Sequence, residues 1–285
     1  MKMLKVIASF LAFLLLASFN LRAQGDIISA DEFMNLIKAD KTVVIVDANK
    51  PGNYEANHVK GAINIYHNDL YQEGEIAGLI RSPEELAAFF GEKGISETTP
   101  VVIYDDGSQK YSSRVYWILK YLGAENVKLL HKDMDAWRKA RIPLTAQPST
   151  LAAVTFKPNM GKEELMAGMG CIKKHQNDPH VVIVDNRTAD EYNGVSKSEG
   201  HLPGAININY EDLLTETGAF KPAEELQAIA DAHGITPDKE VIFYCRTSVR
   251  AAVAFAAFRN ILGYKDVKVY DGAYLEWAAS NPVVQ

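Results

Sequence analysis

The sequence predicts an α/β protein built from two similar domains in tandem, each a parallel β-sheet flanked by helices. The first reason is an internal repeat, in which Thr42-Val-Val-Ile-Val-Asp47 returns as His180-Val-Val-Ile-Val-Asp185. The second is a set of short, continuously apolar runs rich in β-branched residues, as expected for strands covered on both faces. The third is that helical patterns separate these runs, so that strand, crossover helix and strand alternate in both halves.

The elements of the two halves correspond in order. Strands are predicted at 43–46 and 101–104 in the first half, and at 181–184 and 241–244 in the second. Helices are predicted to begin at Ser82-Pro83-Glu84-Glu85 and at Pro222-Ala-Glu-Glu-Leu226, because each motif joins a proline to early acidic residues. Helices over 113–122 and 248–262 are predicted to end at Gly123 and Gly263, since glycine is the usual helix C-cap.

The first 23 residues are predicted to be a signal peptide. Lys2 and Lys5 precede a 14-residue apolar run, Val6–Phe19, and a small-residue cleavage pattern ends at Ala23. The alternative, an uncleaved membrane anchor, needs about 20 apolar residues. We therefore expect a first domain at 24–145, a linker at 146–158 and a second domain at 159–285. The mature protein is expected to be periplasmic or secreted, with no membrane attachment after cleavage.

Composition and charge exclude several classes of protein. The 285 residues are 47% hydrophobic and 23% charged, with a net charge of −6, which are ordinary values for a globular protein. No long run of lysine and arginine offers a surface to a nucleic acid. The two cysteines, Cys171 and Cys245, lack the C-x-x-C spacing typical of zinc sites. We expect no metal, no cofactor and no nucleic-acid partner.

Cys245 is the candidate nucleophile. It follows the predicted strand 241–244 and opens the sequence Cys245-Arg-Thr-Ser-Val-Arg250, which leads into a helix. Open parallel sheets bind their ligands at the carboxyl ends of the strands. At that position successive backbone N–H groups, the helix dipole and the guanidinium groups of Arg246 and Arg250 stabilise a thiolate. The loop predicts a sulfur nucleophile that is active near neutral pH without a histidine base.

Four ordered motifs give the chain a family resemblance. They are Asp185-x-Arg187, Gly200-His-Leu-Pro-Gly-Ala205, the loop Cys245-x4-Arg250, and Val267-x-Val-Tyr-Asp-Gly272 leading to Trp277. Together they resemble the rhodanese domain, and the tandem arrangement resembles the thiosulfate/3-mercaptopyruvate sulfurtransferases. The resemblance implies two tandem rhodanese-like domains, the second catalytic, and a double displacement through a persulfide on Cys245. It also implies a small-molecule sulfur donor and an acceptor such as cyanide, a thiol or a thiol protein.

The composition of the loop favours thiosulfate as the donor. Arg246 and Arg250 suit a compact dianion, and Thr247 and Ser248 offer hydroxyl groups to donor oxygens or to the persulfide. Val249 completes the predicted substrate-binding loop, and Arg187 is predicted to join it. Family members that use mercaptopyruvate typically have a Cys-Gly-Ser-Gly-type loop, so 3-mercaptopyruvate is the alternative donor. A non-enzymatic module that binds a partner or carries persulfide sulfur is a further alternative.

Two other activities are weighed against sulfur transfer. A phosphatase requires Cys-x5-Arg, whereas four residues separate Cys245 from Arg250, and Tyr244 rather than a histidine precedes the cysteine. The first half has Asp105 and Asp106 where the second has Cys245 and Arg246, and Asn49 where the second has Arg187. We therefore predict an inactive first domain that covers the active-site face of the second. Carboxylate catalysis at Asp105 and Asp106 is the alternative.

The remaining candidates have structural interpretations. Cys171 lies in an apolar, small-residue segment and is predicted to be a core residue, with a resolving thiol or a disulfide to Cys245 as alternatives. Two tryptophans and two histidines recur at matching positions, and we predict core packing for the former and structural hydrogen bonds for the latter: Trp137, Trp277, His58 and His201. If Arg187 is structural, it is expected to pair with an acid such as Asp190 or Glu191.

Overall fold

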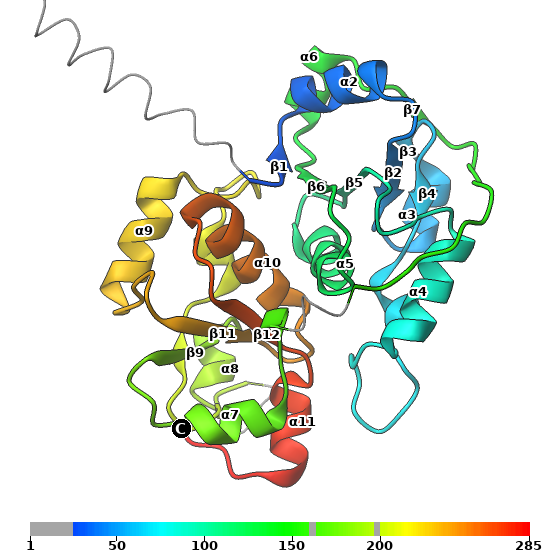
Figure 1. Ribbon diagram of the computed structural model, residues 1–285. Helices are drawn as coiled ribbons and strands as arrows, with labels where there is room; N and C mark the ends of the chain where they lie inside the picture. The colour runs from blue at the N-terminus through cyan, green and yellow to red at the C-terminus, as the bar shows by residue number, and fades with distance from the viewer. Residues whose placement is uncertain (1–24, 160–163, 197–199) are drawn as a thin grey trace, which may run out of the picture.

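The computed structural model describes residues 25–159, 164–196 and 200–285, and it contains two five-stranded parallel sheets (Figure 1). The first sheet has the order β1-β6-β5-β2-β4, with β1 (Ile27–Ile28), β6 (Val127–Leu130), β5 (Val101–Tyr104), β2 (Val44–Asp47) and β4 (Ile63–Asn64). The second has the order β8-β12-β11-β9-β10, with β8 (Met166–Ala167), β12 (Val267–Tyr270), β11 (Glu240–Tyr244), β9 (Val181–Asp185) and β10 (Ile206–Asn207). The two orders correspond strand for strand, so the predicted tandem α/β fold is confirmed.

Helices cover both sheets. In the first domain they are α2 (Ala30–Ala39), α3 (Pro51–Ala56), α4 (Pro83–Glu92), α5 (Lys110–Tyr121), α6 (Met134–Ala140) and the 3-10 turn η2 (His67–Leu70). In the second they are α7 (Met169–His175), α8 (Ala189–Tyr192), the 3-10 turn η4 (Tyr210–Leu213), α9 (Ala223–Ala232), α10 (Val249–Ala257) with its π-helical continuation η5 (Phe258–Leu262), and α11 (Ala273–Ser280). A small antiparallel pair, β3 (His58–Val59) and β7 (Leu144–Thr145), closes the first domain.

The helix ends follow the local chemistry that predicted them, with two corrections. Ser82 caps α4 through a capping box with Glu85, and Gly263 ends η5 in the left-handed conformation. The helix predicted at 113–122 begins earlier, at Lys110, because Gln109 turns the chain at φ 61°. The helix predicted at 248–262 begins at Val249, because Ser248 makes the same turn at φ 63°.

The two domains pack through α5 and α10, which lie side by side between the sheets (Figure 1). Residues of both helices belong to one continuous apolar cluster, so the interface is an extension of the two cores. The hydroxyl of Tyr116 on α5 also donates to Asn260 Oδ1 at 3.2 Å. Residues 146–159 form neither helix nor strand, and they run along the first domain, where the Val154 N–H donates to the Gly91 carbonyl.

The structural interpretations of the recurring side chains are confirmed. Trp137 and Trp277 are each 2% exposed. His58 bonds the carbonyls of Tyr54 and Gln147 and stacks on the Tyr54 ring, and His201 bonds the carbonyl of Tyr192 and stacks on its ring. The domain limits 24–145, 146–158 and 159–285 stay predictions, and the signal peptide at 1–23 lies outside the described residues. No helix in the described ranges is long and apolar enough to span a bilayer.

Candidate active site

Cys245 lies in the turn between β11 and α10, at the carboxyl end of the second sheet. Tyr244, the residue before it, pairs with Asp185 at the end of β9. Ser248 begins the helix from a left-handed conformation, which curls the loop around the cysteine. The side chain of Cys245 is 1% exposed, so only a small group can reach the sulfur.

Glu191 holds Arg250 against the sulfur of Cys245, although the sequence suggested this acid as a partner of Arg187. The two terminal nitrogens of Arg250 donate to the Glu191 carboxylate at 2.7 and 3.0 Å. Although burial opposes it, the hydrogen bonds and charges of Glu191 and Cys245 raise the pKa of Arg250. In turn, against the effect of burial, Arg250 and the Thr188 cap lower the pKa of Glu191 to about 2. The guanidinium is therefore a fixed positive charge beside Cys245, and sequence reasoning missed Glu191 as its partner.

Three backbone N–H groups of the loop are available to an anion. Among the described residues, no acceptor is found for the N–H groups of Thr247, Ser248 and Val249. Unpaired N–H groups at a helix start are the donors that an anion requires. The hydroxyl of Ser248 does not contribute, because it is buried and directed to the carbonyl oxygens of Tyr270 and Asp271 at 2.5 and 3.0 Å. The prediction that this hydroxyl serves the donor or the persulfide is wrong.

The matching loop of the first domain is wrapped around a carboxylate. Asp105 follows β5 as Cys245 follows β11, and its oxygens accept the backbone N–H groups of four residues, namely Gly107, Gln109, Tyr111 and Ser112, at 2.9 to 3.2 Å. The Ser112 hydroxyl adds a fifth bond. The loop has lost the nucleophile, but it still binds a negative charge and fills the position with its own side chain. Asp105 is buried and fully engaged, which argues against carboxylate catalysis there.

Arg187 is a structural residue, which corrects its place in the predicted substrate-binding set. It has no exposed surface. Its Nε and Nη2 atoms donate to the Asp185 carboxylate at 2.9 and 2.6 Å, and Nη2 also donates to the Gly200 carbonyl at 2.8 Å. The guanidinium carbon lies 4.1 Å from the centre of the Tyr274 ring. Its partner is thus Asp185, two residues before it, and neither Asp190 nor Glu191.

Three other predicted substrate-binding residues lie in the Cys245 loop. Arg246 is exposed and Thr247 is half-buried, and with Val249 they stay predicted substrate-binding residues.

Cys171 is half-buried on α7, both cysteines are free, and burial raises the pKa of the Cys171 thiol. Cys171 therefore lacks the features of a second nucleophile. In the parts of the chain that the structure describes, no cluster of three or more metal-binding side chains occurs.

The first domain contacts the site through Asp271, and no sequence motif predicted this contact. The Asp271 carboxylate, just after β12, accepts Arg114 Nη2 of α5 at 2.5 Å and the Ile80 N–H at 3.0 Å. Arg114 also donates to the Gly78 carbonyl. A Cβ atom on Gly78 would lie 2.8 Å from that of Thr247, so this segment is pressed against the Cys245 loop. The first domain thus covers the face of the second domain that carries the Cys245 loop.

Comparisons with known proteins agree with this architecture. A model of the rhodanese-like domain matches residues 29–140 and 169–280. Thiosulfate sulfurtransferase of Gallus gallus is 32% identical over 217 residues, covering 72% of this chain and 72% of that protein. The sulfur carrier protein TtuD of Thermus thermophilus is 30% identical over 238 residues, covering 79% of this chain and 83% of TtuD.

A solved structure extends the agreement to the whole fold. SseA from Escherichia coli, which was solved for the rhodanese fold and mechanism of 3-mercaptopyruvate sulfotransferases, matches with a TM-score of 0.78 and 27% identity. The match covers 88% of this chain and 99% of SseA. These similarities support a sulfurtransferase, and the chain belongs to the rhodanese-like domain family, with one such domain in each half.

Proposed function

We propose that this protein is an exported sulfurtransferase that moves a sulfane sulfur from thiosulfate to a thiophilic acceptor through a persulfide on Cys245. The observation that carries the proposal is the environment of the thiol. Cys245 sits in a loop in which the N–H groups of Thr247, Ser248 and Val249 have no acceptor among the described residues, next to the fixed charge of Arg250. The matching loop of the first domain, closed around Asp105, supports the view that such a loop receives a negative charge.

The proposed reaction has two displacements at sulfur. The Cys245 thiolate attacks the outer sulfur of thiosulfate, the sulfur–sulfur bond of the donor breaks, and sulfite leaves with the bonding electron pair. The outer sulfur of the new persulfide then carries the negative charge beside Arg250 and the loop N–H groups. An acceptor such as cyanide or a thiolate attacks that outer sulfur and releases the Cys245 thiolate. No net oxidation or reduction of the protein remains after the cycle.

The choice of donor rests on Arg246 more than on Arg250. Because Arg250 is bound by Glu191, its remaining capacity is directed to Cys245, and Arg246 is the exposed guanidinium at the mouth of the loop. A sulfonate group suits such a guanidinium through charge-assisted hydrogen bonds. The limited exposure of Cys245 favours a donor whose reactive atom is terminal and small. 3-Mercaptopyruvate is the second candidate, and similarity to SseA favours it.

Intact mass spectrometry tests the proposal directly. The purified protein is incubated with thiosulfate, freed of small molecules and weighed, and a gain of one sulfur atom that cyanide removes is expected. Cys245→Ser is expected to gain nothing and to have no turnover, because a hydroxyl stays protonated in the same loop. Cys171→Ser is the matched control and is expected to gain the sulfur as the wild type does. Persulfide formation in Cys245→Ser would contradict the proposal.

Export and localisation form a separate part of the proposal. They rest on the charged, apolar and small-residue pattern of residues 1–23. The protein is recovered from the periplasm or medium of an expressing bacterium and weighed. Its mass is expected to be that of a chain beginning at Gln24. Recovery of the uncleaved chain in the cytoplasmic fraction alone would contradict this part and leave the sulfur chemistry unaffected.

A further inference from the structure

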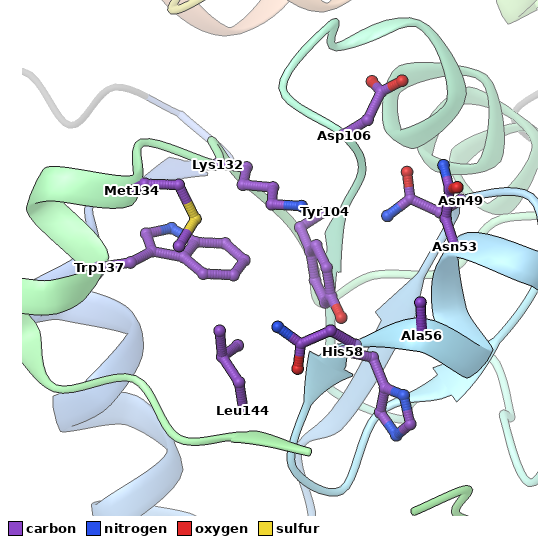
Figure 2. A pocket seen from close by; sticks show the side chains of 11 residues that line it. Asn49, Asn53, Ala56, His58, Tyr104, Asp106, Lys132, Met134, Trp137 and Leu144 are labelled. Atoms are coloured by element: carbon purple, nitrogen blue, oxygen red, sulfur yellow. The ribbon is translucent and has the colours of Figure 1, made fainter. Parts of the chain in front are cut away.

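The first domain contains a cavity that plays no part in the proposed sulfur chemistry. Its volume is about 250 Å³, and its lining includes Asn49, Tyr104, Asp106, Lys132, Met134 and Trp137. Figure 2 shows Lys132, Met134 and Trp137 on one side of the open space and Asn49 and Asn53 on the other. Such a volume suits a ligand smaller than most drug-like molecules.

The cavity exists because the first repeat has lost a buried side chain that the second repeat keeps. Asp47 and Asp185 occupy the same place at the ends of β2 and β9, paired with Tyr104 and Tyr244. Two residues later stands Asn49 in the first repeat and Arg187 in the second. The backbone is held alike in both, since Asn64 bonds the carbonyls of Asp47 and Asn49 as Asn207 bonds those of Asp185 and Arg187, all at 2.9 Å.

The ring that covers the arginine has been lost as well. In the second repeat Tyr274 on α11 stacks against the Arg187 guanidinium. Counting from the matching strands β6 and β12, the residue in the place of Tyr274 is Met134 on α6. Trp137 and Tyr104 remain as aromatic walls, in edge contact at 5.2 Å between ring centres. A guanidinium and its aromatic cover have therefore been removed together, and the residues that replace them, Asn49 and Met134, line the cavity.

Of the polar groups left behind, Asp47 keeps its donors and the Asn49 amide oxygen has none within the described residues. Asp47 is fully buried, and its carboxylate accepts the Tyr104 hydroxyl at 2.6 Å and the Asn49 N–H at 2.9 Å, where Asp185 has a guanidinium in addition. The Asn49 side chain is 3% exposed, and its Oδ1 atom has no partner among the described residues. A buried acceptor without a donor costs free energy, so the Asn49 end of the cavity favours a ligand that brings N–H groups.

The rim of the cavity carries one charge of each sign. Asp106 is exposed, and within the described residues it accepts one hydrogen bond, from the Ser108 N–H at 3.0 Å. Lys132 makes neither an ion pair nor a hydrogen bond within the described ranges, and it acts on Asp47 only through space. An ammonium group that lines a cavity without a partner favours a carboxylate on the ligand.

We infer that this cavity binds a small guanidino compound that also carries a carboxylate, with the guanidinium directed to Asn49, which stands where the second repeat has Arg187, and the carboxylate directed to Lys132. The aromatic walls of Tyr104 and Trp137 complete the site, since a guanidinium stacks readily on aromatic faces.

Calorimetric titration of the full-length protein with L-arginine tests the inference. Arginine is expected to bind. Agmatine lacks the carboxylate and is expected to bind roughly tenfold more weakly. Norleucine lacks the guanidinium and is expected to give no measurable binding. Absence of arginine binding up to about 10 mM would overturn the site, as would equal binding of norleucine. Equal binding of agmatine would overturn the role given to Lys132.

Two variants locate the binding. Asn49→Arg combined with Met134→Tyr rebuilds the filling of the second repeat, and it is expected to abolish arginine binding while the unfolding midpoint in urea stays the same or rises. Lys132→Gln leaves the packing of the cavity walls unchanged. It is expected to weaken the binding of arginine roughly tenfold without changing the binding of agmatine. Lys38→Gln, an exposed lysine on α2, is the matched control. Arginine binding that survives both the double variant and Lys132→Gln unchanged would place the ligand elsewhere and overturn the inference.

Discussion

Replacing Glu191 by glutamine tests the ion pair that fixes Arg250 beside Cys245. The carboxylate of Glu191 accepts both terminal nitrogens of Arg250, and it also accepts the Thr188 N–H and hydroxyl at 3.2 Å. Glutamine has the same shape and can complete the same capping box with Thr188. The substitution Glu191→Gln therefore removes the charge from the Arg250 pair and leaves the start of α8 in place.

The expected loss of stability follows from the pKa of Glu191. Against the effect of burial, Arg250 and the Thr188 cap together lower this pKa from 4.5 to about 2, which corresponds to at most ~3 kcal/mol of stabilisation of the charged form. Glu191 is only 7% exposed, but Arg250 is partly solvated and both partners share the same interaction. We therefore expect a loss of about 1–2 kcal/mol in the free energy of unfolding at neutral pH.

Urea denaturation of the wild type and Glu191→Gln across a pH series measures this loss. Because the pKa of Glu191 is lowered in the folded protein, its contribution is complete above about pH 4.5 and disappears as the pH falls through about 2. The difference between the two proteins should therefore shrink on acidification. Asp190→Asn, on the same helix, is the control and should behave as the wild type. A difference below about 0.5 kcal/mol at pH 7, or one unchanged by acid, would refute the reasoning.

Three further substitutions separate binding from structure. Arg246→Ala is expected to lower kcat/KM for thiosulfate by roughly 10- to 100-fold and that for 3-mercaptopyruvate less, and equal losses for both donors would contradict our choice of donor. Arg187→Met is expected to lower the free energy of unfolding by about 3–5 kcal/mol in urea denaturation, because it leaves the buried Asp185 carboxylate without its cation. A stable variant with a raised KM would return Arg187 to the substrate site. Arg114→Met is expected to cost a similar amount by uncovering Asp271, and unchanged stability would count against the interdomain pair.

The fold could be predicted from the sequence because its signals are local and occur twice. The apolar runs at 181–184 and 241–244 lie within β9 and β11, and the capping box at Ser82 begins α4 where the motif indicated. The position of Cys245 followed from the same signals, since a cysteine that ends a buried parallel strand must lie at the ligand-binding edge of the sheet.

The partners of the charged side chains could not be predicted, because they depend on where loops meet. Arg187 has acids two, three and four positions away, and only the backbone turn after β9 decides that its guanidinium folds back on Asp185. Glu191 reaches Arg250 across the sheet edge, at a separation of 59 residues. Asp105 was interpreted from its charge alone, although the loop length that lets it accept its own backbone N–H groups is a local feature of the sequence.

The contact across the domain interface explains how the first domain can lack a nucleophile and remain part of the active site. Ser248 sets the left-handed turn of the Cys245 loop, and its hydroxyl is tied to the carbonyl of Asp271. The carboxylate of Asp271 is neutralised by Arg114 and bonded by Ile80, both from the first domain. Every residue from Ala251 to Ala257 on α10 is buried, and α5 covers that helix. Without the first domain, the nucleophile loop would lose the charge that holds Asp271 and the apolar cover of the helix that follows it. The loop of the first domain needs no thiol for this role, and the Asp105 carboxylate that fills it keeps α5, and with it Arg114, in position.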